Sequence, residues 1–392
     1  MILYYNKKTE MWSHSNQNLQ LTFGANTLPI PWEKNSNPCL TYKVHQKGNK
    51  VGPIVGIMVH QLEGKFFGNK KFVSSIAKKL IKNKCIPVIF SFDQLIGEEK
   101  IAGLLYNHQK NNWIPASFPI PDIIYNRINN RQIEQTRKFH QVLQHIKSKN
   151  IPFFNPHFLN KFATHLIFRT DRELKKYLPP TISIYSKEEL AAFCRKWKTA
   201  YFKPRSKARG SGIFIAKFHD DGTIIVKTYE KVKKFHSFHS FWQTYNKQFI
   251  KDQYLAQKAI YTKKHKGRRY DFRVIAHSDL YRYIVIGIGV RVAGDHNITT
   301  HVQRGGKLIS FDKVGSTALY KHISFIINKI GKQLTDHFGY FGEFSVDIGE
   351  TKRGELYIFE VNAKPMSFDE EKIEEKRLNH LCQLFLALAK FQ

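Results

Sequence analysis

The chain has few acidic residues, few cysteines and no long apolar run. Its 392 residues include 31 Asp and Glu against 63 Lys and Arg, a formal net charge of +32. The four cysteines are scattered without a Cys-x-x-Cys pair, which excludes a disulfide scaffold and a cysteine zinc site and is typical of a reducing compartment such as the cytoplasm. No apolar run approaches the length that spans a bilayer, and residues 1–5 are too few for a signal-peptide core, so we expect no membrane anchor.

Apolar and aromatic residues are plentiful. Hydrophobic residues make up 42% of the chain and aromatic residues 14%, which is ample for packed cores in two or three structural units. The sequence therefore predicts a globular protein. Its positive charge favours anionic partners, such as an anionic polymer. The argument for a nucleic-acid-binding function is this charge alone, because no nucleic-acid-binding module is recognisable in the sequence. We therefore rank that function last.

Three segments differ in pattern. Residues 1–50 are polar with short alternating patches, which predicts a small β-rich region. Residues 51–156 contain a buried strand at 54–59, a helix with apolar spacing over 72–83 and a second strand at 86–90, typical of an α/β front domain. Residues 157–392 continue without a linker and predict one catalytic domain. We expect the fold class to be α+β.

An acidic hairpin is the most informative motif. Residues 342–348 alternate so that Glu343, Ser345 and Asp347 share one strand face, and Glu360 and Asn362 share a face of the strand that follows. Mg²⁺ prefers hard oxygen ligands and is usually held by one or two carboxylates together with substrate phosphates. Asp347, Glu360 and Asn362 therefore predict a nucleotide–metal site. The same alternation also fits an ordinary edge hairpin with an acidic solvent face.

A basic, glycine-containing loop joins two apolar strands. Lys203 ends the first strand, and Gly210 and Gly212 in the loop allow backbone N–H groups to approach an anion closely. This predicts a phosphate-binding flap, although the Gly-Lys-Ser/Thr ending of a Walker loop is missing. An ordinary hairpin turn remains the alternative.

Several arginines could also bind phosphate oxygens bidentately, among them Arg291 and Arg304. Each of these arginines, considered alone, could equally be an ordinary charged residue on the surface. Asp271 and Arg273 lie on one strand face, where an internal ion pair is the simple explanation.

In order, these motifs resemble the ATP-grasp superfamily and, within it, the YheC/YheD family of endospore coat-associated proteins. The resemblance covers most of the chain and includes a Trp and a Pro-Asp-x-x-Tyr-x-Arg signature in the front domain. The matching positions are Trp113, 119–127, Lys161, 178–181, 203–204, 210–213, Gln257, 271–273, Arg291, 305–306, Asp347 and 360–365. It implies an ATP-grasp fold preceded by an α/β pre-ATP-grasp-like domain.

The resemblance also implies roles for individual residues. Lys203 and Lys161 would hold the α- and β-phosphates of ATP, covered by the loop that contains Ser211 and Gly212. The segment with Gln257, Lys258 and Ile260 would form the hinge that binds adenine. Arg291 would neutralise the γ-phosphate and the acyl phosphate, Arg273 would lie near the acceptor, and Mg²⁺ would bind Asp347, Glu360 and Asn362. His301 stands where the family pattern has an asparagine before the Gly-Gly turn that begins at Gly305. This departure from the family concerns the substrate contacts.

Together these features predict an ATP- and Mg²⁺-dependent carboxylate–amine (or thiol) ligase that acts through an acyl phosphate. Its partners would be a small-molecule or peptide carboxylate and an amine acceptor, with an association with the spore coat. The alternative is a non-catalytic coat or scaffold protein that keeps the ATP-grasp shape.

Overall fold

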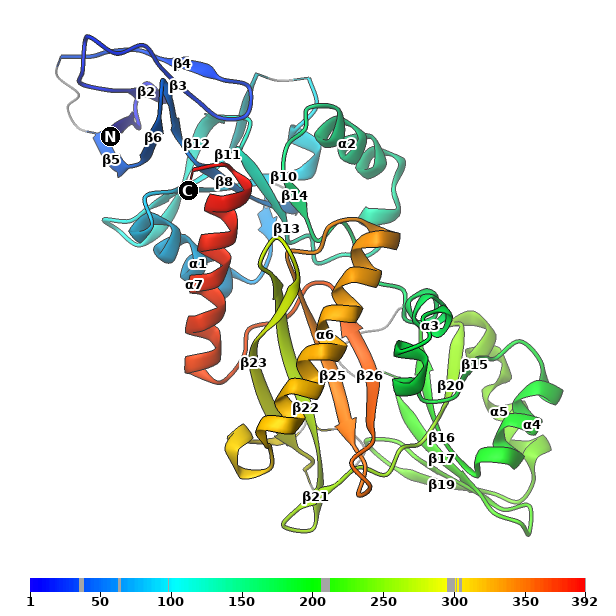
Figure 1. The fold of residues 1–392 in the computed structure, drawn as a ribbon. Helices are drawn as coiled ribbons and strands as arrows, with labels where there is room; N and C mark the ends of the chain where they lie inside the picture. The colour runs from blue at the N-terminus through cyan, green and yellow to red at the C-terminus, as the bar shows by residue number, and fades with distance from the viewer. Residues whose placement is uncertain are drawn as a thin grey trace.

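The chain forms a front unit and two lobes, each built around β-sheet (Figure 1). The computed structural model describes residues 1–34, 39–62, 65–97, 99–205, 212–294, 300, 302 and 305–391. Short 3₁₀ helices punctuate the connections at Phe92–Gln94, Ile133–Gln135, Leu174–Tyr177 and Phe311–Lys313.

Two small sheets form the N-terminal region. The three-stranded sheet has the order β2-β1-β5 and the four-stranded sheet the order β4-β3-β7-β6. Their strands are β1 (Ile2–Asn6), β2 (Met11–Ser13), β3 (Leu21–Phe23), β4 (Leu28–Ile30), β5 (Cys39–Lys43), β6 (His45–Lys47) and β7 (Lys50–Gly52). Trp12 is packed against Tyr5, Phe23 and Tyr42, so these short strands share an aromatic core. The predicted β-rich region is confirmed.

The front unit is an α/β layer. Its strands are β8 (Ile54–Leu62), β9 (Lys65–Phe67), β10 (Ile86–Ser91), β11 (Lys100–Asn107), β12 (Asn112–Pro119), β13 (Ile123–Asn126) and β14 (Phe153–Phe154), and its helices are α1 (Lys70–Lys82) and α2 (Arg137–Ser148). The path is β12-β11-β10-β8-β13-β14, and the pairs β10/β8, β8/β13 and β13/β14 are parallel. Helix α1 begins after Asn69, which accepts the Phe72 N–H, and buries Phe72, Ile76 and Leu80 as its spacing predicts.

The smaller lobe carries an antiparallel sheet. Its order is β15 (Thr181–Ser183), β20 (Tyr254–Lys258), β16 (Thr199–Pro204), β17 (Phe214–Phe218), β18 (Ile224–Lys227) and β19 (Val232–Phe235). Helices α4 (Lys187–Trp197) and α5 (Phe238–Lys251) belong to this lobe, and α3 (Lys161–Thr170) precedes it. Phe202 stacks on Phe214 and Phe249 within an aromatic core. The hairpin β16–β17 is the predicted flap, but its loop at 206–211 lies outside the described residues.

The larger lobe carries the acidic hairpin. Its sheet has the order β24 (Lys307–Ile309), β23 (Tyr283–Val292), β22 (Arg268–Ser278), β25 (Glu343–Glu350) and β26 (Leu356–Asn362), with β21 (Lys264–His265) paired to β22. Helix α6 (Thr317–Phe338) packs on this sheet and ends at Gly339, whose φ of 96° allows the chain to leave the helix. Strand β25 is buried along its whole length between β22 and β26, whereas β26 is the edge strand of the sheet and is partly buried.

Helix α7 (Glu371–Leu388) joins the larger lobe to the front unit. In Figure 1 it runs beside α1, and its residues Leu381 and Phe385 belong to the same core as Phe72 and Tyr125 of the front unit. The front unit and the larger lobe are therefore packed together. The α+β class is confirmed, and the boundaries predicted near residues 50 and 156 stay a prediction.

Candidate active site

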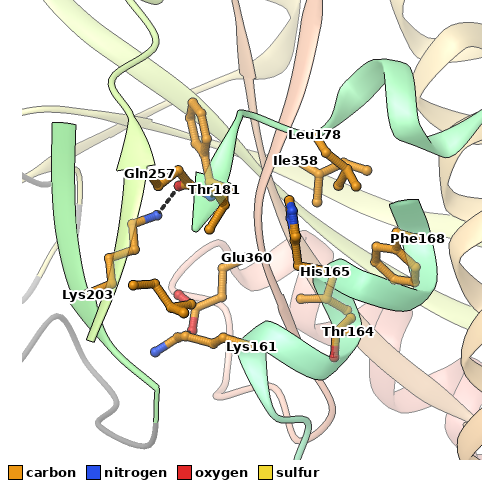
Figure 2. Close-up of a pocket in the computed structure, with 13 residues that line it drawn as sticks. Lys161, Thr164, His165, Phe168, Leu178, Thr181, Lys203, Gln257, Ile358 and Glu360 are labelled. Carbon is orange, nitrogen blue, oxygen red and sulfur yellow. Dashed lines mark hydrogen bonds and ion pairs between the residues drawn. The ribbon is translucent and has the colours of Figure 1, made fainter. Parts of the chain in front are cut away.

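A pocket lies between the two lobes, at the edge of both sheets (Figure 2). Helix α3, strands β15, β16 and β20 of the smaller lobe, and strand β26 of the larger lobe all contribute to its wall. The lining residues are Lys161, Thr164, His165, Phe168, Leu178, Thr181, Lys203, Leu255, Gln257, Ile358, Phe359, Glu360 and Val361. Three predicted nucleotide-binding residues and one predicted metal ligand, Glu360, therefore share one pocket.

Lys203 is held by a chain of hydrogen bonds across the smaller sheet. Its Nζ donates to Gln257 Oε1 at 2.6 Å, and Gln257 Nε2 donates to Thr181 Oγ1 at 3.0 Å. Tyr201 is the Cα partner of Gln257, so Lys203, two residues further on, lies on the same face of the sheet. Burial lowers the pKa of Lys203 to about 8, against the opposing charge of Glu360. An anion in the pocket would favour the charged lysine.

Lys161 approaches the same space from the first turn of α3. Its Nζ is 3.4 Å from Glu360 Oε1, and the two side chains are only 14% and 23% exposed. Figure 2 shows Lys161 and Lys203 around the Glu360 carboxylate. Two lysines from different elements thus converge beside one acid of the larger lobe.

Arg291 is the fixed cation of the larger lobe. Its Nε donates to Asp271 Oδ1 at 2.9 Å, and its Nη2 is 3.0 Å from Asp347 Oδ2. Thr300 donates a further hydrogen bond to Asp271. Burial opposes the charge, but the two carboxylates outweigh it and raise the pKa of Arg291. The guanidinium is buried, and its Nη1 has no hydrogen-bond partner within the described part of the chain.

The acids predicted to bind metal lie on neighbouring strands. Asp347 on β25 is the Cα partner of Glu360 on β26, and Ser345 is the partner of Asn362, with an irregularity in the register after Asp347. The donor set of two carboxylates and one amide suits Mg²⁺, which binds hard oxygens and keeps water or phosphate as its other ligands. No group of three His, Cys, Asp or Glu side chains suited to a metal is present among the described residues.

Arg273 faces this row from β22. It is the Cα partner of Asp347 on one side and of Gly289 on the other. Its guanidinium lies 5.2 Å from the centroid of the Phe368 ring, and burial lowers its pKa against the charge of Asp347. Asp271 pairs with Arg291 rather than with Arg273, because the two residues are opposite each other on β22 and β23.

Other predicted contacts lie away from the pocket wall. The Nζ atom of Lys258 lies 4.1 Å from the centroid of the Trp197 ring. Ile260 follows the end of β20. Gly212 has a φ of 74°, and its carbonyl accepts a hydrogen bond from Tyr254 Oη at 2.9 Å. Ser211, His301 and Arg304 fall outside the described residues.

Sequence reasoning missed the apolar and histidine lining contributed by α3. Thr164, His165 and Phe168 lie three, four and seven residues after the predicted Lys161, so they share its face of the helix. Burial, together with Arg169, lowers the pKa of His165 to about 4. This helical spacing was the signal that could have found them.

A second missed feature is a buried charge network at the junction with the front unit. Glu343 on β25 is bound by Arg377 of α7 and contacted by Tyr125 and Arg127 of the front unit. Arg127 Nη2 also donates to Pro365 O at 3.0 Å. The Tyr-x-Arg part of the front-domain signature therefore contacts the turn that directly follows Glu360 and Asn362.

Two more side chains hold that turn. Asn155 Nδ2 donates to Ala363 O at 2.6 Å, and Lys364 Nζ donates to Ile128 O at 2.9 Å and contacts Glu134. The front unit thus fixes the position of the strand end that carries the candidate metal ligands.

Comparison with known proteins identifies the fold and the family. The fold is that of the ATP-grasp ligases: the D-alanine–D-alanine ligase from Coxiella burnetii superposes with a TM-score of 0.54 at 10% identity, covering 86% of this chain and 94% of that one. Residues 150–391 match the YheC/D-like ATP-grasp family, and the chain belongs to this family.

Two curated relatives come from Bacillus subtilis (strain 168). The endospore coat-associated protein YheD is 29% identical over 344 residues, which span 82% of this chain and 74% of YheD. The endospore coat-associated protein YheC is 22% identical over 300 residues, spanning 73% of this chain and 82% of YheC. Within the described residues, no helix has the length and apolarity needed to cross a membrane.

Proposed function

We propose that this chain is an ATP- and Mg²⁺-dependent ligase that joins a carboxylate to an amine through an acyl phosphate. The observation that carries the proposal is Arg291, a buried guanidinium fixed by Asp271 and Asp347 beside the acidic hairpin. A preorganised cation of this kind stabilises charge that develops during phosphoryl transfer without having to rearrange.

We assign the following roles to the residues of the site. Lys203 and Lys161 bind the α- and β-phosphates. The backbone from Gln257 to Ile260 contacts the adenine. Asp347, Glu360 and Asn362 would hold Mg²⁺, which would offset the negative charge of the phosphates when bound.

The reaction has two steps. The substrate carboxylate attacks the γ-phosphorus, a new O–P bond forms, and the bond to ADP breaks. The amine then attacks the acyl carbon, a C–N bond forms, and phosphate leaves. Arg291 neutralises the transferred phosphoryl group in both steps, and Arg273 lies on the acceptor side. This chemistry requires positioning and charge neutralisation more than a protein nucleophile.

The names of the two relatives favour a second function, a coat or scaffold protein without turnover. The convergence of Lys161, Lys203 and Glu360 on one pocket argues against it, since a scaffold has no need of ionisable groups gathered in a partly buried cavity. Under either function we place the chain in the cytoplasm of a sporulating cell, in association with the spore coat. A fluorescent fusion followed through sporulation tests that location.

The test of the ligase uses the purified full chain with ATP, Mg²⁺, pooled carboxylates including acidic peptides, and the twenty amino acids. We expect release of ADP and phosphate and a covalent adduct on the carboxylate by intact-mass spectrometry. DNA, which offers no carboxylate, should not stimulate turnover. Tight DNA binding at physiological salt without turnover on any carboxylate would replace the ligase with a binding role.

A further inference from the structure

Glu370 occupies the N-cap position of α7 but does not cap it. Its side chain makes no capping hydrogen bond, whereas Glu374 Oε2 accepts the Phe368 N–H at 2.9 Å. Glu370 Oε1 is buried and has no hydrogen-bond partner among the described residues. A buried carboxylate oxygen without a partner is costly, so its position calls for an explanation.

The carboxylate lies against the sheet at Gly289. A Cβ atom built on Gly289 would be 2.5 Å from Glu370 Oε1, so only glycine leaves room for the carboxylate at this position. Gly289 is the Cα partner of Arg273 and lies two residues before Arg291 on β23. Because alternate residues of a strand share a face, Glu370 lies on the face that carries Arg291 and Arg273.

The two arginines do not satisfy this carboxylate. Arg291 is engaged by Asp271 and Asp347, and Arg273 lies over the Phe368 ring. No ion pair joins Glu370 to either of them in the part of the chain that the structure describes. Burial raises the pKa of the Glu370 carboxyl, and so does the adjacent Asp369. These effects outweigh a hydrogen bond from the backbone N–H of Glu370 itself and the charges of the two arginines.

We infer that Glu370 binds the ammonium group of the acceptor and accepts its proton, so the acceptor is an amine rather than a thiol or hydroxyl. This inference rests on the proposed function and names its second substrate. An ammonium would give Glu370 Oε1 the charge-assisted hydrogen bond that it lacks, beside the residues assigned to the acyl phosphate. A thiol or a hydroxyl would offer only a neutral donor, which binds a carboxylate more weakly than an ammonium does, and an anion would be repelled by it.

The step balances in atoms and charge. The ammonium gives one proton to the Glu370 carboxylate and becomes a neutral amine. The amine nitrogen attacks the acyl carbon, the C–N bond forms, and the C–O bond to phosphate breaks. The second proton leaves with the phosphate, so the products are the amide, hydrogen phosphate and the protonated Glu370.

A structural role for Glu370 is the rival explanation, because acids in the first turn of a helix are stabilised by the helix dipole. Glu371 offers a matched control. It is exposed, lies one residue further along the same helix turn and carries the same charge. Removing either charge changes the dipole interaction similarly, but only Glu370 faces Gly289.

The experiment separates the two half-reactions in the full chain. ATP labelled with ¹⁸O at the β,γ-bridge is incubated with Mg²⁺ and pooled N-acetyl amino acids and dicarboxylates, and scrambling of the label reports the acyl phosphate without any amine. Pooled amino acid amides, hydroxylamine or small thiols are then added, and the products are measured by mass spectrometry. The variants are Glu370→Gln, Glu371→Gln and Gly289→Ala, the last of which displaces the carboxylate without removing it.

We expect Glu370→Gln to leave label scrambling and hydroxylamine trapping unchanged and to lower kcat/KM for the amines by about a hundredfold. Gly289→Ala should show the same selective loss, and Glu371→Gln should behave as wild type. Three outcomes would overturn the inference about Glu370 and leave the proposed function standing. They are unchanged amine use in Glu370→Gln, an equal loss of scrambling and amine use in that variant, and thiol products from the wild type. Absence of scrambling in the wild type with every donor would overturn the proposed function, and the inference with it.

Discussion

Arg377 binds Glu343 through two parallel hydrogen bonds, Nε to Oε2 and Nη2 to Oε1, each 2.9 Å long. Both side chains are fully buried at the junction of α7, β25 and the front unit. Burial opposes the carboxylate charge, but Arg377 and His277 outweigh it and lower the pKa of Glu343 well below its usual range. The pair therefore stays charged in the core, where its charges depend on each other.

Replacing one partner of this pair should destabilise the fold strongly. We expect Arg377→Met to lower the free energy of unfolding by about 3–5 kcal/mol, because it leaves the Glu343 carboxylate buried without its main partner. Urea denaturation followed by circular dichroism measures this. The surface pair Lys329–Glu173 is the control, and Lys329→Met should leave stability unchanged. A loss no larger than that of the control would show that Arg127 and His277 suffice to stabilise Glu343.

Lys203→Ala tests the nucleotide site. The variant removes a charge-assisted phosphate contact, so ATP affinity should fall by about one to two powers of ten. Isothermal titration calorimetry measures the affinity, and thermal unfolding checks that the fold is intact. Lys217→Ala, on the exposed side of the neighbouring strand β17, should bind ATP as the wild type does. Equal affinities for all three proteins would favour the scaffold function.

Glu360→Gln tests the metal site. It replaces a hard anionic ligand with a neutral group of the same shape, so Mg²⁺-dependent turnover should be lost while the melting temperature of the ligand-free protein stays nearly the same. Asn362→Leu should reduce turnover less, because the ligand it removes is neutral. Both are read as ADP release at several Mg²⁺ concentrations. Full turnover by Glu360→Gln would contradict the assigned ligands.

His380 predicts a loss of stability in mild acid. Its Nδ1 lies 3.1 Å from His277 Nδ1, and burial together with His277 lowers the pKa of His380 from 6.5 to about 4. At a pH between these two values, the histidine is protonated in the unfolded chain but not in the folded protein. The free energy of unfolding therefore falls as the pH drops through this window. For one proton the fall is at most about 1.4 kcal/mol per pH unit.

We therefore expect His380→Gln to flatten the dependence of unfolding free energy on pH between 6.5 and 4. Glu343, Glu374 and Arg377 also face this histidine pair and remain in the variant. The exposed His236→Gln is the control and should keep the wild-type slope. The same slope in both variants would assign the acid sensitivity to other groups.

The sequence predicted those parts of the molecule that local pattern determines. Alternation identified β25 and β26, and the apolar spacing over residues 72–83 identified α1. Residue type and order also selected Lys203 and Glu360, which the structure brings to one pocket. In each case the signal lies within one strand or helix, or in its order along the chain.

The remaining features depend on contacts between distant segments. The burial of Arg291 depends on Asp271 of the neighbouring strand, and Tyr125 meets Glu343 across 218 residues of chain. The position of Lys258 over Trp197 and the approach of Glu370 to Gly289 depend likewise on how elements pack. No local pattern encodes such pairings, so they could not be predicted from this sequence alone. The roles assigned to the site residues stay predictions until the variants are measured.

The packing of α7 into the core of the front unit constrains the order in which the chain can mature on the ribosome. Synthesis releases the front unit first, yet Leu381, Cys382 and Phe385 complete the core formed by Phe72 and Tyr125. Until α7 emerges, this apolar surface stays exposed and β25 lacks its buried counter-charge. The nascent front unit therefore reaches its final packing only after both lobes have been translated.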